Sequence, residues 1–329
     1  MDPTEALPEE LGSLLERFHA GKRTALARAI SLIEDERPGF QEFLHRVLAA
    51  GPRARRVGVT GPPGGGKSSL IAALANLYRA RDEEVGVVAV DPTSPYSRGA
   101  LLGDRIRMND LATDGGVFIR SMATRGSLGG LAATSKEVID LMDAFGLTPL
   151  LIETVGVGQT ELEITGAADT VVVVLVPESG DGIQAMKAGL MEIADIFVVN
   201  KADRPGADHV LNDLRGALHL RAGKMLDPAH WAIPVLKTVA QTGEGVPELL
   251  DAVDRHLEHL QESGELEVRR RGRAAARVRE VTERTLHGIL WGGDATRALF
   301  EVGLDEIQQR TATPYSVSAS ILQLLLAEE

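Results

Sequence analysis

One stretch of the chain fits the pattern G-x-x-x-x-G-K-[ST], which is typical of a phosphate-binding loop: Gly61-Pro62-Pro63-Gly64-Gly65-Gly66-Lys67-Ser68. An apolar strand candidate (55–60) precedes it, and residues 69–78 follow with apolar side chains at helical spacing. Glycines let successive N–H groups turn toward phosphate oxygens, and a following helix presents the positive end of its dipole to the same anion. The chain is therefore predicted to bind a nucleotide. The flanking strand and helix disfavour the alternative, a glycine-rich turn that precedes Lys-Ser by chance.

Specific roles follow from the pattern. Lys67 would reach the β- and γ-phosphates, and the hydroxyl of Ser68 would be a ligand of Mg²⁺. We expect the phosphate contacts to come from consecutive residues: Gly61, Pro62, Pro63, Gly64, Gly65, Gly66, Lys67, Ser68 and Ser69.

Composition excludes several classes of protein. The formal net charge of −12 argues against a general nucleic-acid binder. The chain has no cysteine, which excludes disulfides, cysteine catalysis and cysteine-based metal sites. Because the first residues are acidic and no apolar run of about 18 residues occurs, we expect neither a signal peptide nor a membrane span, and a cytoplasmic location.

Strand and helix candidates alternate from residue 55 onward. Several strand candidates are continuous runs of β-branched residues, as in strands buried on both faces of a parallel sheet. The strands are expected at 55–60, 84–90, 116–120, 149–153, 170–176, 195–200 and 234–238. The helices between them are expected notably at 128–145, 183–193, 207–220 and 246–261. This alternation predicts a doubly wound, mostly parallel α/β domain with ligands at the carboxyl ends of its strands.

Helical patterns flank this domain. We predict an N-terminal helical extension (1–51), the nucleotide-binding domain (52–262) and a C-terminal helical arm (263–329). The N-terminal helices could also form a solvated appendage. The arm carries a basic cluster between Arg269 and Arg279 that suits a solvated or subunit-facing helix better than a nucleic-acid patch. Its last helix, over 318–326, is amphipathic.

The base is indicated by Asn200-Lys201-Ala202-Asp203, which follows a buried strand and fits the guanine signature N-K-x-D. Asp203 can accept hydrogen bonds from N1–H and the exocyclic amine of guanine, whereas adenine would leave the carboxylate partly unpaired. After the next strand, Val239, Ala240 and Gln241 lie where guanine O6 would meet a backbone N–H, and Ala240 is the expected donor. Val239 replaces the usual serine there. The sequence therefore favours GTP and GDP over adenine nucleotides.

Three carboxylates are expected at one edge of the sheet. Glu153 begins Glu153-Thr154-Val155-Gly156, where glutamate takes the place of the aspartate in D-x-x-G, and it can still hold Mg²⁺ through water. Asp91 and Asp104 are expected at the same edge of the sheet, although Asp104 could instead cap a helix.

The residue that would orient the attacking water is missing from its usual place. Ras-like GTPases have glutamine directly after D-x-x-G, and this chain has Val157 there and Gln159 two residues later. We therefore expect slow intrinsic hydrolysis, with the catalytic site completed by another loop of the chain or by a partner that stimulates turnover. Lys187 is a candidate cation for the transition state or an ordinary surface lysine. The candidate catalytic residues are Lys67, Asp91, Asp104, Gln159 and Lys187.

Together these motifs resemble the MeaB/ArgK-like GTPases, the chaperones associated with methylmalonyl-CoA mutase and called MMAA in animals. The matching segments are 61–69, 91–95, 103–108, 118–121, 126–130, 153–159, 180–189 and 200–203. The resemblance covers residues 55–250, and the helical ends match in type.

The resemblance implies a Mg²⁺ shell of Ser68, Asp91, Asp104 and Glu153, and nucleotide-sensitive switches at 92–108, 153–165 and 178–190. It also implies a homodimer and, as partner, an adenosylcobalamin-dependent acyl-CoA mutase whose cofactor loading and protection the GTPase gates. Two departures are Ser127, where histidine is common, and Ala188, where a second basic residue is common and whose absence weakens the role of Lys187.

Other functions stay open. A metallochaperone GTPase for nickel or zinc usually has cysteine or clustered histidine ligands, and this chain offers one close pair, His256 and His259, which a charged helix would normally leave solvated. A P-loop kinase for a small molecule would not need N-K-x-D. A protein that senses GTP without hydrolysing it is a further alternative.

Overall fold

The structure is a computed structural model that describes residues 7–49, 51–91, 109–123, 134–154, 158–177, 189–222 and 231–327. By its internal contacts the chain divides into two compact units, Met1–Glu267 and Val268–Glu329. Within the described residues, no helix is long and apolar enough to cross a membrane.

Seven parallel strands form the sheet of the first unit, in the order β3-β2-β4-β1-β5-β6-β7. All seven predicted strands are present: β1 (Arg56–Thr60), β2 (Val85–Asp91), β3 (Val117–Ala123), β4 (Leu150–Glu153), β5 (Thr170–Leu175), β6 (Ile196–Asn200) and β7 (Val235–Thr238). Every residue of β5 is buried, as a run of β-branched side chains covered on both faces requires.

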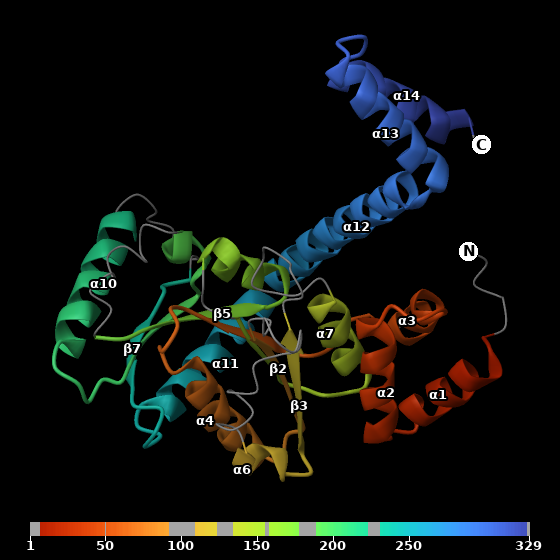
Figure 1. Cartoon of the computed structure of the whole chain (residues 1–329). Coiled ribbons are helices and arrows are strands. Elements are labelled where there is room, and N and C mark those ends of the chain that lie inside the picture. The colour runs from red at the N-terminus through yellow and green to blue at the C-terminus, as the bar shows by residue number, and fades with distance from the viewer. Residues whose placement is uncertain are drawn as a thin grey trace. The chain divides into compact units, whose positions relative to one another are not determined.

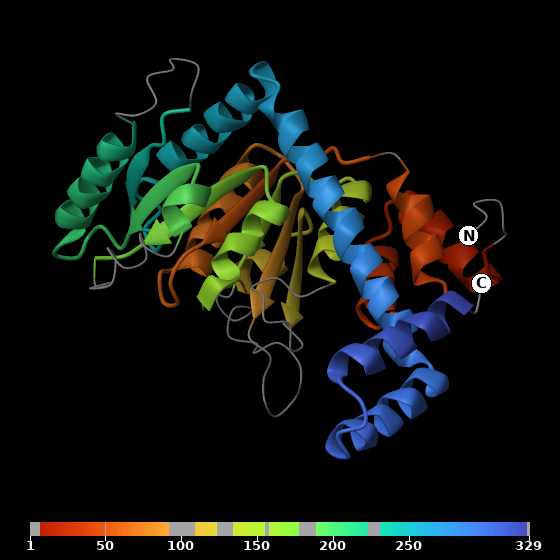
Figure 2. The same cartoon turned by 90° about the horizontal axis from the view of Figure 1, so that it is seen from above.

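Helices cover both faces of this sheet (Figures 1 and 2). Their bounds are α4 (Lys67–Ala80), α6 (Asn109–Ala112), α7 (Ser135–Ala144), the 3₁₀ helix η1 (Gly158–Gly166), α9 (Met191–Ile193), α10 (Ala207–Ala222) and α11 (Val246–Glu262). Side chains alternate between the faces along a strand. Val172 and Val174 pack with α4 and α11, whereas Val171 and Val173 share the opposite core with α7, η1 and α10. The doubly wound fold is confirmed.

Two predicted helices differ in extent from the described ones. The helix expected at 128–145 is described from Ser135 to Ala144, and residues 124–133 lie outside the described residues. The helix expected at 183–193 is represented by α9, because 178–188 also lie outside.

The N-terminal helices α1 (Glu9–His19), α2 (Arg23–Glu34) and α3 (Phe40–Leu48) belong to the first unit (Figure 1). α2 and α3 pack against α7, and α1 packs against α2 and α3. Phe18 is buried and its ring meets that of Phe145 edge-on at 5.2 Å. Arg120 of β3 pairs with Glu34, and Arg23 donates a hydrogen bond of 2.8 Å to the carbonyl of Val117. These contacts exclude the solvated appendage.

The strand order changes direction at β1. β4, β2 and β3 lie on one side of β1, and β5, β6 and β7 lie on the other. In sheets of this kind the crevice for a ligand opens at the carboxyl end of the strand where the order reverses. The segment that follows β1 is the glycine-rich loop.

The second unit contains most of α12 (Glu265–Gly292), followed by α13 (Asp294–Gln308) and α14 (Pro314–Ala327). α13 and α14 pack closely at Gly303. A Cβ added to this glycine would lie 2.4 Å from Cγ1 of Val317, so the absence of a side chain permits the approach. Val317 and Ile321 of α14 are both buried, and the amphipathic pattern at 318–326 lies within this helix.

Candidate functional site

The loop between β1 and α4 requires glycine at two positions for different reasons. Gly61 has a φ of 132°, and a Cβ there would lie 2.1 Å from the carbonyl oxygen of Val174. Gly66, directly before α4, has a φ of 83°, and a Cβ there would lie 2.4 Å from Nδ2 of Asn200. The loop thus packs against β5 and β6 so closely that side chains at these positions would displace it.

Lys67 is buried at the start of α4, and its ammonium group is directed back into the loop. Nζ donates hydrogen bonds to the carbonyl oxygens of Gly61, at 2.8 Å, and Pro62, at 3.1 Å. A phosphate group bound in the loop would compete with these two carbonyls for the same cation. Lys67, the residue predicted to bind the phosphates, therefore has its ammonium group against the phosphate-binding loop.

Ser68 and Glu153 are buried together beside the loop. The Ser68 hydroxyl donates a hydrogen bond of 2.8 Å to Oε1 of Glu153. A hydroxyl and a carboxylate are oxygen donors of the kind that Mg²⁺ prefers, and Mg²⁺ usually keeps several waters beside a few protein ligands. These two residues fit a magnesium site. In the described part of the chain, no group of three or more histidine, aspartate or glutamate residues is placed to hold a metal.

The remaining residues of the predicted Mg²⁺ and catalytic set are incompletely described. Asp91 is the last residue of β2, and Gln159 lies in η1, but the side chains of both lie outside the description. Asp104 and Lys187 lie outside the described residues altogether, as do the predicted switch at 92–108 and most of the one at 178–190.

Asn200 joins the phosphate-binding loop to the loop after β7. Its Nδ2 donates a hydrogen bond of 2.8 Å to the carbonyl of Gly65. Its Oδ1 accepts hydrogen bonds from the Thr238 hydroxyl and from the N–H of Ala240, each at 3.1 Å. Ala240, predicted to donate to guanine O6, therefore donates to Asn200 in this structure. Thr238 was missed by sequence reasoning, although its place at the end of β7, level with Asn200, is a usable signal.

The other residues of the predicted base site lie on two adjacent turns. Lys201 has a left-handed backbone with a φ of 56°, and Asp203 is exposed two residues later. Val239 is buried and donates a hydrogen bond of 2.9 Å to the carbonyl of Glu244. Gln241 is exposed.

A hollow of about 450 Å³ lies between α4 and this second turn. Its lining includes one predicted phosphate-binding residue and two predicted base-binding ones: Ser69, Ala240 and Gln241. The predicted phosphate and base segments thus meet at one surface.

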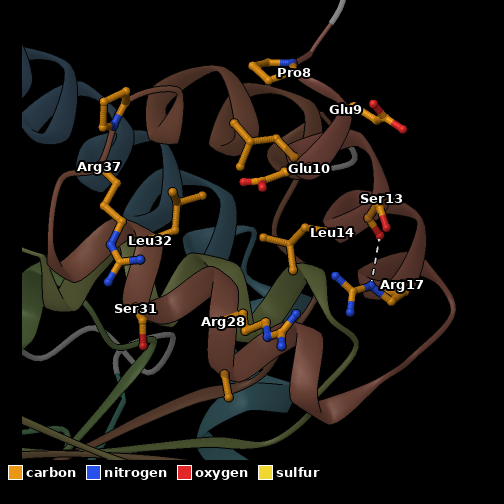
Figure 3. Close-up of a pocket in the computed structure, with 13 residues that line it drawn as sticks. Pro8, Glu9, Glu10, Ser13, Leu14, Arg17, Arg28, Ser31, Leu32 and Arg37 are labelled. Atoms are coloured by element: carbon orange, nitrogen blue, oxygen red, sulfur yellow. Dashed lines mark hydrogen bonds between the residues drawn. The ribbon is translucent and has the colours of Figure 1, made fainter.

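A larger hollow, of about 1080 Å³, lies between the N-terminal helices and contains none of the predicted site residues (Figure 3). Leu14 and Leu32 form part of its lining, and Arg17 and Arg28 lie at one end of it. Arg17 donates a hydrogen bond of 3.2 Å to the Ser13 carbonyl. Its lining residues all lie between Pro8 and Pro38, so the hollow is separate from the predicted nucleotide site.

The histidine pair on α11 does not behave as a solvated pair. His256 is fully buried, its Nδ1 lies 2.8 Å from the Thr170 hydroxyl, and its Nε2 lies 3.2 Å from Oδ1 of Asp195. Trp231 lies against both His256 and His259. The expectation that both histidines are solvated is wrong for His256, because α11 turns this side chain toward the amino ends of β5 and β6.

Comparison with known proteins gives a consistent result. The family model described as "Methylmalonyl Co-A mutase-associated GTPase MeaB" matches residues 26–294. A protein of Pyrococcus abyssi, provisionally named as a GTPase, is 45% identical over 319 residues, which are 96% of this chain and 97% of that protein. The mouse protein named "Methylmalonic aciduria type A homolog, mitochondrial" is 36% identical over 82% of this chain and 69% of its own length.

The fold is shared with a solved structure as well. A crystal structure described as that of a LAO/AO transport system kinase superposes with a TM-score of 0.70 and 26% sequence identity. The match covers 98% of this chain and 100% of that one.

Proposed function

This chain belongs to the family of methylmalonyl-CoA mutase-associated GTPases, and on that premise we propose that its GTP hydrolysis serves an adenosylcobalamin-dependent acyl-CoA mutase. The chain is a GTPase, as its family and its named relatives are. In the proposed role it gates the loading and protection of the mutase's cofactor. The family match supports the choice of client. The Asn200 side chain, which is hydrogen-bonded to the phosphate-binding loop and to the loop after β7, supports a single nucleotide site.

Each part of this site has a proposed task. Lys67 would exchange its carbonyl partners for the β- and γ-phosphates, and Asp203 would read the guanine edge. Mg²⁺ would be held by Ser68, Asp91, Asp104 and Glu153 and would supply charge neutralisation between the phosphates. The buried Ser68–Glu153 pair supports this assignment, because both groups are oxygen donors already adjacent to the loop.

Hydrolysis by the free protein should be slow. Val157 cannot orient water, and Gln159 and Lys187 are the chain's own candidates for positioning water and stabilising charge. We propose that contact with the mutase brings the segments 153–165 and 178–190 into their active arrangement.

A homodimer is part of the proposal. Eleven of the thirteen large apolar residues that are exposed among the described residues lie in Val268–Glu329: Val268, Val278, Val281, Leu286, Ile289, Trp291, Phe300, Val302, Leu304, Tyr315 and Leu322. Exposed apolar side chains concentrated in one unit of a chain are typical of a protein interface, and a second copy is the commonest partner.

A second candidate function comes from the solved structure described as a transport system kinase. A kinase would transfer the γ-phosphoryl group to a second substrate instead of to water. A kinase would have no need of the N-K-x-D segment, whose Asn200 is hydrogen-bonded to Gly65 of the phosphate-binding loop.

A nickel or zinc chaperone would need accessible metal ligands. The contacts of the buried His256 with Thr170 and Asp195 leave no open histidine pair on α11.

The test is release of phosphate from GTP, with and without a purified adenosylcobalamin-dependent mutase from the same organism, and with ATP as the control nucleotide. We expect turnover that is selective for GTP, slow alone and faster with the mutase. GTP turnover that saturating mutase leaves unchanged would reject the mutase as the client. Phosphate that appears on a third molecule instead of in solution would favour the kinase.

A further inference from the structure

Two buried threonine hydroxyls meet where β1 and β4 end. Oγ1 of Thr60 lies 2.8 Å from Oγ1 of Thr154, and these residues are 0% and 1% exposed. Thr60 directly precedes Gly61, the first residue of the phosphate-binding loop, and Thr154 directly follows Glu153. The hydroxyl pair therefore links the two segments that carry the phosphate ligand and the proposed Mg²⁺ carboxylate.

The backbone ladder that holds Glu153 stops at this point. The last registered pairs of β4 are Glu153 with Val59 of β1 and Glu153 with Ala89 of β2. Beyond them, the N–H of Thr154 donates to the Val59 carbonyl at 3.3 Å, which is longer than most backbone hydrogen bonds. The hydroxyl bond is thus the shorter of the two links that the structure describes between Thr154 and β1. Strand ends with few hydrogen bonds open most readily. A link directly after Glu153 therefore limits movement of the Glu153 carboxylate.

We propose that Thr60 and Thr154 are a positioning pair that holds the Glu153 carboxylate in register with Ser68 and thereby sets the affinity of the site for Mg²⁺. The inference rests on the proposed Mg²⁺ site. Successive side chains alternate across the sheet, so the threonines lie on the opposite face from Glu153 and act through the backbone without touching the metal. Groups that orient metal ligands from outside typically change metal affinity by 10–100-fold when they are removed.

The chemistry of the pair separates positioning from stability. Each hydroxyl has one proton, and one of the two donates to the other. Replacing one threonine by valine leaves the other hydroxyl buried without its partner, which lowers stability whatever the pair does for the metal. Replacing both by valine removes both polar groups while keeping the shape, so the stability returns toward that of the wild type.

The experiment compares Thr60→Val, Thr154→Val and the double variant with wild type. The readouts are the thermal unfolding midpoint without nucleotide and the Mg²⁺ concentration that half-saturates the binding of fluorescent GDP. We expect both single variants to unfold at lower temperature and the double variant to recover most of this loss. The double variant should still need about tenfold more Mg²⁺ than wild type. Thr282→Val, which removes an exposed hydroxyl in α12, is the matched control and should leave both readouts unchanged.

Three results would overturn the proposal. One is a double variant that recovers stability and binds Mg²⁺ as wild type does, which would make the pair merely structural. A second is a raised Mg²⁺ requirement in Thr60→Ser/Thr154→Ser, a variant that keeps both hydroxyls. The third is GDP binding by wild type that does not depend on Mg²⁺ at all. That result also removes the proposed metal site, whereas the first two leave it intact.

Discussion

The Asn200 side chain joins two loops of the candidate nucleotide site. Its amide makes three hydrogen bonds inside the protein, to Gly65, Thr238 and Ala240. A primary amide has two donors and two acceptor lone pairs, so most of its capacity is used in holding the two loops together. Asp203, the residue proposed to bind the base, is exposed on the neighbouring turn.

We expect Asp203→Asn to lose GTP affinity and to gain affinity for XTP. The amide presents donors to a guanine edge that also presents donors, and the loss of hydrogen bonds to a charged group corresponds to about 2 kcal/mol, or roughly 30-fold in Kd. Competition of GTP and XTP for fluorescent GDP measures both changes. Asp208→Asn, an exposed aspartate paired with Lys237, is the control and should leave both affinities unchanged. Undiminished GTP affinity in the Asp203 variant would reject the base assignment.

Asp114 is held by hydrogen bonds that favour its ionised form. The N–H of Gly116 donates a hydrogen bond of 2.7 Å to Oδ1, and Arg79 donates one of 3.0 Å to Oδ2. These bonds lower the pKa of the Asp114 carboxyl below its ordinary value. A lowered folded-state pKa means that the carboxylate stabilises the fold above the unfolded-state pKa, and that this contribution is lost as pH falls through the folded-state pKa.

Asp114→Asn should therefore unfold at a lower temperature than wild type at pH 7, and the difference should shrink as the pH is lowered below about 4. Thermal unfolding across this pH range is the measurement. Asp294→Asn, at an exposed helix start, is the control for a general loss of one negative charge. A difference between wild type and Asp114→Asn that stays constant with pH would contradict the proposed cause.

At the scale of elements, the contact between β1 and η1 places the segment after Glu153 over the sheet. Gly58 of β1 lies beneath η1, and a Cβ added there would lie 2.4 Å from Cγ1 of Ile164 and 2.9 Å from Cβ of Ala168. Ile164 is fully buried in this contact. The absence of a side chain at Gly58 is therefore what lets η1 approach the strand that leads into the phosphate-binding loop.

We expect Gly58→Ala to lower the free energy of unfolding by about 1–3 kcal/mol, because an extra methyl group in a packed contact must displace η1 or the strand. Urea unfolding monitored by circular dichroism gives this quantity. Gly216→Ala is the matched control: it lies within α10 with no atom near its added Cβ, and it should stabilise the protein by up to about 1 kcal/mol. Equal effects of the two substitutions would show that packing at η1 is not the cause.

At the scale of the whole molecule, the two compact units bury their apolar residues very differently. The first unit covers both faces of its sheet with two clusters of buried apolar side chains, one on each face. In the second unit, Val317 and Ile321 are buried, but Ile289 and Val302 are 56% and 55% exposed. This difference in burial supports the proposal that the second unit packs against a second copy of the chain.

The dimer proposal predicts that Ile289→Lys/Val302→Lys shifts the protein to a monomer, because lysine in an apolar interface must be desolvated without a partner. Sedimentation equilibrium over a range of concentrations gives the mass. Gln308→Lys/Gln323→Lys adds the same charge at exposed polar positions of the same unit and should remain dimeric. A wild-type protein that is monomeric at all concentrations, or a lysine variant that stays dimeric, would contradict the proposal.

Sequence patterns predicted most of the fold because each pattern here is local. Apolar runs, several of them β-branched as at 170–176, predicted all seven strands, and the glycine motif at 61–68 fits the observed strand, loop and helix. Local patterns were less informative about the bounds of helices, since the helix expected at 128–145 is described from Ser135 to Ala144. They were also less informative about the surroundings of a side chain, since His256 was expected to be solvated and is buried. Asp104, Lys187 and the switch segments around them stay predictions, since they lie outside the described residues.

By itself, the sequence determined which residue types are available and which elements they form, because strand and helix periodicity and the glycine-rich motif depend on neighbours along the chain. Tertiary structure alone decided which of these residues meet. Ser68 and Glu153 are 85 positions apart, Thr60 and Thr154 are 94 apart, and Gly65 and Asn200 are 135 apart. These pairs arise from the order of parallel strands and the close approach of their carboxyl ends, and no local pattern records that order.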